Sequence, residues 1–334
     1  MRSLHYLLPA LLLSSAPAFI SHAAAKDEKP KHKAYTSPAS TDDDFIIQGE
    51  YVGESQGDKL GVQIIALGDN TFEAVTYLGG LPGAGWEGDR QIVTRVKGKR
   101  EPGDTTVIFR SEIETAEADG NMVYLTNPHG MSIGELTRTQ RESPTLKAAP
   151  PAGALVLFDG KGTNDFTGSR VTEDGLLMEG ATSASKFQDF SIHLEFCLPY
   201  MPTARGQARG NSGIYLQGRY EVQMLDSFGL EGKDNECGGL YKIASPRENL
   251  CFPPLSWQTY DIDFTAAKFD TSGKKTANAK VTVKHNGVLI HENVELPGTT
   301  GAAPNKDESA TPGPIYLQNH GNPVRYRNVW VKEN

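Results

Sequence analysis

The strongest constraint on the fold is an alternation of apolar and polar residues in the second half of the chain. From Phe190 to Cys197, the residues Phe190, Ile192, Leu194 and Phe196 alternate with more polar neighbours. Successive side chains of a β-strand point to opposite faces, so this period of two predicts a strand that buries one face. The same pattern recurs in residues 214–217, 220–225, 260–264 and 315–320.

Turn signals separate these segments, and nothing between them has the pattern of a crossover helix. Asn286-Gly287 stands between two apolar runs, as in a type I′ hairpin. The 35 glycines and 20 prolines among 334 residues also favour many turns. We therefore expect an all-β fold in which residues 153–334 form a jelly-roll sandwich.

Residues 45–140 also read as short strands between turns, and they predict a small β-rich domain of unassigned role. A sheet, a sandwich and a small barrel are all consistent with this pattern. The loop at 79–89 could hold a ligand through Trp86, but we favour a flexible hairpin tip because a single Trp is weak support. Residues 141–152, which contain Pro144, Pro150 and Pro151, predict an interdomain linker.

The start of the chain has the order of an export signal. Arg2 precedes an apolar run, and small residues ending in Ala23–Ala25 come before the first charged residues. A retained membrane anchor is the alternative, but the apolar run is shorter than the ~20 residues needed to span a bilayer. We expect residues 1–25 to be removed, the protein to be periplasmic or extracellular with no membrane span, and residues 26–44 to be a flexible linker.

Charge and cysteine content restrict partners and cross-links. The formal net charge of -8 argues against nucleic acid and anionic membranes as partners. Of three cysteines, Cys237 and Cys251 are the expected disulfide in an oxidising compartment. Cys197 ends an apolar strand and is expected to be a buried thiol.

The polar residues that alternate with the apolar ones are rich in carboxylates, amides and imidazoles. An ordinary solvated face would carry more Lys, Thr and Ser. We expect these residues to share the outer face of one sheet and to form a carbohydrate-binding groove. They are His193, Glu195, Glu221, Gln223, Asp261, Asp263, Gln318 and His320.

Within this set, Glu221 and His320 are the candidate catalytic residues. Glu221 and Gln223 are two residues apart, so they share a face, and a strand holds a carboxylate rigidly enough for proton transfer. The alternative for Glu221 is an ion pair with Arg219, Arg325 or Arg327. His320 suits proton exchange near neutral pH, although a structural hydrogen bond is the alternative.

Two further groups are candidates for ligand binding. Asp226, with Asp234 and Glu236, could hold a divalent cation, although the spacing matches no EF-hand. Tyr241 and Trp257 could stack against sugar rings at the rim of a groove, or Trp257 could close one end of the core. The chain has no G-x-S-x-G, H-E-x-x-H or dinucleotide-binding motif.

Seven segments resemble the 3-keto-disaccharide hydrolase domain family, which has a concanavalin A-like jelly-roll fold. They run in family order over residues 153–333, and PYMPTARGQARG before Asn211 resembles the longer arrangement of exported, planctomycete-like members. The segments are LFDGKGTNDF, FQDFSIHLEF, RGNSGIYLQGRYEVQMLDS, ECGGLYKIASP, FPPLSWQTYDIDF, HNGVLIHENVEL and GPIYLQNHGNPVRYRNVWV.

The resemblance implies an enzyme that acts on glycosides oxidised at C3, by elimination and then hydration. It implies that Glu221 or His320 is the base or acid. It also implies that the enzyme needs no nicotinamide cofactor, although a metal could polarise the ketone. It also implies that four residues position the sugar: Asn211, Gln223, Gln318 and Arg327.

Two other functions stay open at this point. A lectin-like carbohydrate-binding protein would have the same fold without catalysis. A glycosidase with paired carboxylates would need a second acid about 5–5.5 Å from the first if it retains configuration. Gln223 stands where that second acid would be expected beside Glu221.

Overall fold

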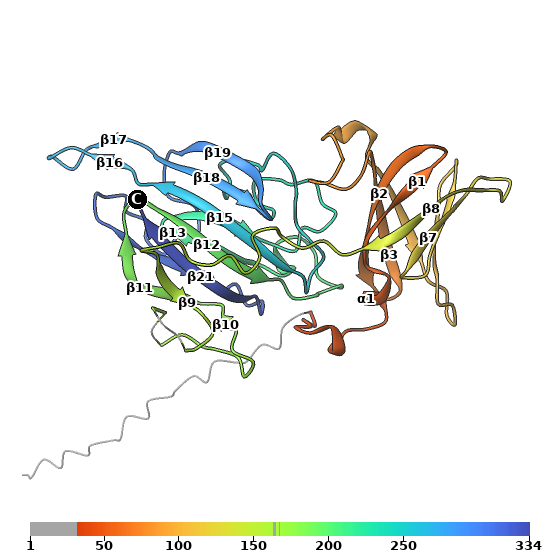
Figure 1. Cartoon of the computed structure of the whole chain (residues 1–334), viewed down its shortest axis with the longest axis horizontal. Helices are drawn as coiled ribbons and strands as arrows, with labels where there is room; N and C mark the ends of the chain where they lie inside the picture. Colours follow the sequence, from red (N-terminus) through yellow and green to blue (C-terminus); the bar gives the residue numbers. More distant parts are fainter. Residues whose placement is uncertain (1–31, 163–164, 167) are drawn as a thin grey trace, which may run out of the picture. The chain divides into compact units, whose positions relative to one another are not determined.

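The computed structural model describes residues 32–334 except 163–164 and 167, so the predicted signal at 1–25 lies outside the described residues. The regular secondary structure of the described chain is almost entirely antiparallel β-strand (Figure 1). Its helices are η1 (Pro38–Ser40), α1 (Asp44–Ile47), η2 (Arg90–Ile92) and η3 (Gly206–Ala208). No helix within these residues has the length and hydropathy to cross a membrane.

Residues 49–139 form a closed barrel in which each strand pairs with the next and the last pairs with the first. The strands are β1 (Gly49–Ser55), β2 (Asp58–Gly68), β3 (Thr71–Leu78), β4 (Thr94–Lys99), β5 (Val107–Arg110), β6 (Thr115–Ala118), β7 (Met122–Thr126) and β8 (Ser132–Thr139). Closure leaves no unpaired sheet edge. Of the three architectures open to this domain, the barrel is the one observed.

The second domain is a sandwich of a seven-stranded and a four-stranded sheet. The larger sheet contains β9 (Leu155–Phe158), β10 (Leu177–Met178), β12 (Phe190–Cys197), β15 (Trp257–Thr265), β18 (Ala279–His285), β19 (Val288–Leu296) and β21 (Arg325–Glu333). The smaller contains β11 (Ala181–Phe187), β13 (Ser212–Leu216), β14 (Tyr220–Met224) and β20 (Gly313–Leu317). A short ribbon is formed by β16 (Lys268–Phe269) and β17 (Lys275–Ala277).

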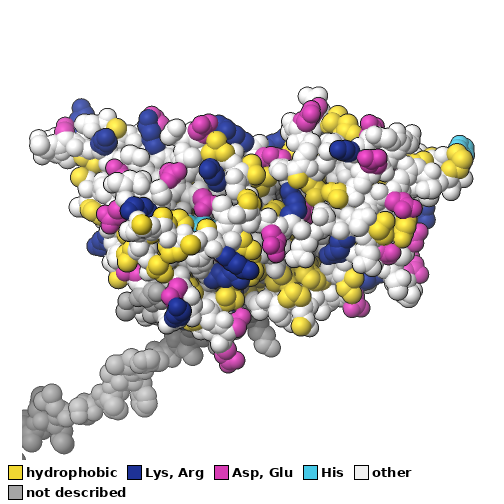
Figure 2. All heavy atoms as spheres, viewed as in Figure 1, with side chains coloured by type: hydrophobic (Ala, Val, Ile, Leu, Met, Phe, Trp, Pro, Cys, Tyr) yellow, Lys and Arg dark blue, Asp and Glu magenta, His cyan; other side chains and the backbone are white. Residues whose placement is uncertain are grey.

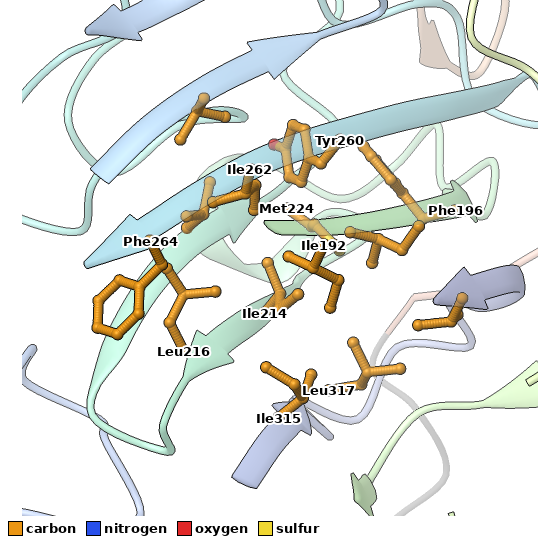
Figure 3. Packing of buried hydrophobic residues seen from close by; sticks show 14 of the residues in the cluster. Ile192, Phe196, Ile214, Leu216, Met224, Tyr260, Ile262, Phe264, Ile315 and Leu317 are labelled. Atoms are coloured by element: carbon orange, nitrogen blue, oxygen red, sulfur yellow. The ribbon is translucent and has the colours of Figure 1, made fainter. Parts of the chain in front are cut away.

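The core of the sandwich is built from the alternating apolar residues. Figure 3 shows Ile192 and Phe264 of the larger sheet packed towards Ile214, Leu216 and the strand that carries Leu317. These side chains are almost completely buried. The period of two therefore predicted the inward face of each strand correctly, and the all-β jelly-roll class is confirmed.

The alternating polar residues do not share one face, and this part of the prediction is wrong. His193, Glu195, Asp261 and Asp263 belong to β12 and β15 of the larger sheet. Glu221 and Gln223 belong to β14 of the smaller sheet, and Gln318 follows β20. Strands of both sheets turn their apolar side chains inward. The same alternation of apolar and polar residues therefore places polar residues on the outer faces of both sheets, which are opposite sides of the sandwich.

The outer face of the larger sheet is covered by the expected linker. The backbone N–H of Lys147 donates to Glu195 (2.5 Å), and Asn328 donates to the carbonyl of Ala148 (3.0 Å). Thr145 donates to Asp261 (2.7 Å). Residues 141–152 therefore include a packed layer, whereas the sequence suggested only a spacer.

Beneath this layer lies the His193 cluster, which we define as His193, Glu195, Asp261, Arg327 and Asn328. His193 and Glu195 have no exposed surface. Cross-strand pairing of β12 with β15 and β21 places His193 opposite Asp261 and Glu195 opposite Arg327. The resulting distances are 2.6 Å from His193 Nδ1 to Asp261 and 2.6 Å from Arg327 Nε to Glu195. Every ionisable group in the cluster has a partner of opposite charge.

Part of the expected linker at residues 26–44 is also packed. Tyr35 forms an antiparallel bridge with Tyr200, with N–O distances of 2.9 and 3.0 Å between their backbones. The Tyr35 side chain is 9% exposed, and its ring lies 5.6 Å from that of Tyr200. Tyr35 is therefore anchored, whereas most of residues 32–44 are exposed or half-buried, as their composition suggested.

The predicted disulfide is absent, because all three cysteines are free thiols. Cys237 and Cys251 are nevertheless in side-chain hydrogen-bond contact within the core, as their spacing suggested. Cys237 also lies 3.3 Å from the hydroxyl of Tyr260. The two sulfurs pack as buried thiols and share their hydrogen bonds with polar neighbours.

The surface carries charges of both signs. Lys and Arg side chains are interspersed with Asp and Glu over the face seen in Figure 2. Recognition of nucleic acid usually needs Lys and Arg gathered on one face. The exclusion of nucleic acid as a partner stays a prediction from the net charge.

The His193 cluster predicts a pH-dependent stability. Burial opposes charge on His193, but hydrogen bonds and charges of Asp261 and Glu195 outweigh it and raise its pKa. A raised folded-state pKa stabilises the protein fully below about pH 6.5, the unfolded value, and this contribution is lost as pH rises through the folded pKa. We expect the melting temperature to fall more steeply above pH 6 in the wild type than in His193→Gln.

Thermal denaturation followed by circular dichroism from pH 5.5 to 8.5 measures this difference. His129→Gln is the matched control, because His129 is an exposed histidine of the barrel. It should keep the wild-type slope. Parallel curves for the wild type and His193→Gln would contradict the prediction.

Candidate functional site

Glu221 is an outward-facing carboxylate that the smaller sheet nevertheless buries. On β14 it alternates with Tyr220 and Val222, which point into the core. Antiparallel pairing with β13 places Tyr215 opposite Glu221 and Gly213 opposite Gln223. Glu221 is only 3% exposed. Buried acids with perturbed pKa values cluster at functional sites, so Glu221 is a candidate functional residue.

Tyr215 holds the carboxylate in place. Its hydroxyl donates to Glu221 Oε2 (2.7 Å) and accepts from the side-chain amide of Gln318 (3.0 Å). Because Tyr215 is fully buried, these bonds are shielded from water. The three side chains form a fixed hydrogen-bonded chain across β14, β13 and the end of β20.

Gly213 provides the space that the carboxylate occupies. A Cβ atom at this position would lie 2.4 Å from Glu221 Oε1, much closer than non-bonded atoms approach. Gly213 has an ordinary backbone conformation, so its role here is to leave room. The absence of a side chain at Gly213 thus leaves room for the Glu221 carboxyl group.

The environment brings the pKa of Glu221 to about 7. Burial raises it because the ionised form loses hydration, and the hydrogen bond from Tyr215 offsets part of that rise. A carboxyl with this pKa is present in both protonation states at neutral pH. At neutral pH the free-energy cost is therefore small both for accepting a proton and for releasing it.

Gln318 presents an unsatisfied acceptor beside this chain. Its Oε1 atom is buried and has no hydrogen-bond partner among the described residues, while its Nε2 atom donates to Tyr215. Buried polar atoms without partners are rare in folded proteins and carry a free-energy cost. A hydroxyl group of a bound ligand would satisfy this atom.

An amide network extends the site along β14. Gln223 donates to the side-chain oxygens of Gln207 and Asn211, both at 3.2 Å. Asn211 also donates to the backbone carbonyl of Gln207 (2.8 Å). We call the whole group the Glu221 cluster, and its members are Glu221, Tyr215, Gln318, Gln223, Asn211 and Gln207. It is rich in neutral groups suited to sugar hydroxyls.

The structure brings some predicted site residues to this cluster and leaves others apart. Tyr241 is adjacent, since its backbone N–H donates to the carbonyl of Glu221 (3.2 Å). His320 is exposed and makes no hydrogen bond or ion pair among the described residues, so its catalytic role stays a prediction. Trp257 lies under Arg327, whose guanidinium is 3.9 Å from the ring centroid.

Arg327, Glu195 and His193 therefore belong with Trp257 on the larger sheet and not with Glu221. The alternative of an arginine pair for Glu221 is also excluded by geometry. Arg325 binds Glu179 (2.8 Å), and Arg219 binds Gln217 (2.8 Å) and the loop at 307–311. Glu221 has a tyrosine partner in place of an arginine.

The three acidic residues suggested for a cation do not fit one. Asp226 is held by Arg209 (2.6 Å), and Glu236 accepts from the backbone N–H of Gly232 (2.7 Å). In the part of the chain that the structure describes, no group of three or more His, Cys, Asp or Glu is arranged to hold a metal.

Sequence reasoning missed Tyr215, Gly213 and Gln207. The alternation of Tyr215 with Ile214 and Leu216 places it on the outer face, but only strand pairing shows which residue lies opposite. Gly213 precedes a β-branched residue in a strand interior, where glycine often marks a close approach. That signal is present in the sequence and could have identified it.

Comparisons with known proteins found a matching family model and similar solved structures. The family model described as "3-keto-alpha-glucoside-1,2-lyase-like domain" matches residues 153–332. A solved Parabacteroides distasonis protein, provisionally assigned as a glycosyl hydrolase, is 34% identical with a TM-score of 0.50. The match covers 55% of this chain and 85% of that one. No curated protein matches.

Two further solved proteins of Parabacteroides distasonis carry the same provisional assignment. One is 19% identical, with a TM-score of 0.40, and the match covers 55% of this chain and 94% of that one. The other is 18% identical, with a TM-score of 0.35, and the match covers 50% and 90%.

Removing the Tyr215 hydroxyl should raise the pKa of Glu221 above its value of about 7. The hydrogen bond from Tyr215 favours the ionised carboxylate and lowers its pKa, so Tyr215→Phe removes a contribution that offsets burial. The carboxyl ¹³C shift of Glu221, followed by NMR from pH 4 to 9, reports this pKa directly. In Tyr316→Phe, which removes a hydroxyl from the neighbouring ring, it should be unchanged. Equal midpoints in Tyr215→Phe and the wild type would refute this assignment.

Proposed function

Because the chain belongs to the 3-keto-alpha-glucoside-1,2-lyase-like domain family, we propose that it cleaves the glycosidic bond of 3-keto-glycosides. The reaction is an elimination followed by hydration, and Glu221 is the general base. The observation that carries this proposal is the buried Glu221 carboxyl with a pKa of about 7. The family and its solved neighbour support the coarser function of a glycoside-acting enzyme.

The proposed substrate explains why one carboxyl suffices. A ketone at C3 acidifies the hydrogen on C2, since the resulting carbanion is an enolate. The carboxylate of Glu221 takes that proton, the bond from C1 to the leaving oxygen breaks, and a double bond forms between C1 and C2. Protonated Glu221 then gives the proton to the leaving oxygen, which departs as an alcohol.

The second half of the reaction uses the same group. Water adds its oxygen to C1 of the unsaturated ketone, and one of its protons passes through Glu221 to C2. The sum of both steps is hydrolysis, with no redox change, and Glu221 returns to its starting state. A pKa near the working pH suits a residue that must act in turn as base and acid.

The neighbours of Glu221 support this reaction better than paired-carboxylate hydrolysis. Retaining glycosidases use a second carboxylate about 5–5.5 Å from the first. On β14 the next outward residue is the amide Gln223, and Asp226 is committed to Arg209. The oxygen of Gln318 has no hydrogen-bond partner among the described residues, so a sugar hydroxyl that reached it would donate to it.

Export belongs to the proposal as well. The order of basic, apolar and small residues in 1–25 supports delivery to the periplasm or the cell exterior. Oxidation of the sugar at C3 is then assigned to a separate enzyme, since this chain lacks a dinucleotide fingerprint.

Turnover of a 3-keto-disaccharide and of its unoxidised parent distinguishes the candidate functions. We expect release of the two sugars from the keto form alone, and a loss of at least ~100-fold in kcat/KM in Glu221→Gln. The wild-type kcat/KM should rise with pH through about 7, because the ionised carboxylate starts the reaction. Binding of both compounds without turnover would instead show a lectin-like protein, and cleavage of the parent would overturn the elimination mechanism.

Gly213→Ala tests the position of the carboxylate without changing its chemistry. The added Cβ would meet Glu221 Oε1 at 2.4 Å, so the carboxyl must move. We expect kcat/KM to fall by at least ~100-fold, since a displacement of about 1 Å has an effect of that size. Gly298→Ala is the matched control, because nothing lies within 4 Å of its added Cβ. Activity of Gly213→Ala equal to that of Gly298→Ala would argue against the proposed base.

A further inference from the structure

A cavity lies where the barrel wall meets the loops of the sandwich. Its volume is about 340 Å³, within the range of small-molecule sites, and it shares no lining residue with the Glu221 cluster. Its lining includes the side chains of Tyr77, Trp86, Arg90, Arg95 and Glu231. The barrel residues come from β3, β4 and the loop between them.

The loop at 79–89 is docked and not the flexible hairpin tip favoured from the sequence. The backbone N–H of Gly83 donates to Glu248 of the sandwich (2.6 Å). A Cβ at Gly80 would lie 2.3 Å from the carbonyl oxygen of Ala84, so only glycine allows the loop to fold back this tightly. The loop therefore holds Trp86 in a defined position.

Trp86 and Tyr77 form an aromatic wall with an unused donor. The two rings meet edge to face, with centroids 5.2 Å apart. The indole Nε1 of Trp86 is buried and has no hydrogen-bond partner among the described residues. Tryptophan N–H groups usually find a partner when buried, so this donor is one that a ligand oxygen would satisfy.

The charges around the cavity favour a neutral ligand. Arg95 is already paired with Glu73 (2.9 Å), and Glu231 is paired with Lys233 (3.1 Å). Arg90 is exposed at the opening and adds hydrogen-bond donors. A strongly anionic ligand would meet Glu231, and a cationic ligand would meet the two arginines. A neutral ring that carries many hydroxyl groups can use donors and acceptors of both signs.

We propose that this cavity is a carbohydrate-binding site for a neutral mono- or disaccharide, stacked on Trp86. A pyranose ring presents C–H groups to an aromatic face and hydroxyl groups to the indole N–H and to charged side chains. The site gives the barrel a role that the catalytic proposal leaves open. It holds saccharide next to the sandwich and does not depend on the chemistry at Glu221.

Isothermal titration calorimetry of the full chain with maltose and cellobiose tests the proposal. We expect binding of at least one disaccharide, weakened about tenfold or more in Trp86→Ala and less in Trp86→Phe, which keeps an aromatic face but loses the N–H group. Tyr124→Ala removes an exposed aromatic ring elsewhere on the barrel and should bind as the wild type does. Glu221→Gln should also bind unchanged, whether or not it abolishes turnover.

Two results would overturn this site. One is the absence of heat for every neutral saccharide with folded wild-type protein, and the other is wild-type affinity in Trp86→Ala. Preference for glucuronate over glucose would contradict the neutral ligand. Melting temperatures of the variants establish that they are folded, and Trp86→Phe provides the comparison if Trp86→Ala is not. Loss of activity in Glu221→Gln with retained saccharide binding separates this site from the proposed reaction.

Discussion

The pairing of β13 with β14 is the constraint on which the site depends. This register sets Tyr215 opposite Glu221 and leaves Gly213 as the gap for the carboxylate. An ionised carboxylate is costly to bury unless it is well hydrogen-bonded, and the Tyr215 hydroxyl donates one such bond to Glu221. The strand pairing therefore sets the proton affinity of this acid as well as its position.

Glu195 shows how the same fold treats a carboxylate differently. Burial would raise its pKa too, but hydrogen bonds from His193, Asn328, Arg327 and the Lys147 backbone lower it to about 2. It therefore stays ionised at physiological pH, whereas Glu221 is divided between two forms. Two buried acids in one sandwich thus differ in pKa because charged donors such as Arg327 surround Glu195, whereas the neutral Tyr215 hydroxyl donates to Glu221.

The sequence was informative about strands and less so about how they assemble. Alternation identified the buried face at Ile192, Ile214 and Phe264 because one face of each strand must be apolar. It could not separate His193 from Glu221, since the period is the same in both sheets. Pairing between distant strands decides which polar residues meet, and no local pattern encodes it.

The strand position of a single side chain was predictable from the sequence, and the partners that it meets were not. Glu221 could be chosen from its strand and its neighbour Gln223. Its partner Tyr215 needed the register, and the placement of Arg327 beside Glu195 needed the order of strands in the larger sheet. The free thiols of Cys237 and Cys251 show the same limit, since spacing brought them together correctly but did not determine whether a bond forms.

Residues of the segment 141–152 pack on the outer face of the larger sheet of the sandwich. The family match starts at residue 153, after the segment that covers Glu195 and His193. A fragment cut at that point would expose an ion-pair network that the intact chain keeps from water. A domain boundary drawn at residue 153 would therefore remove the segment whose backbone donates to Glu195 and accepts from Asn328.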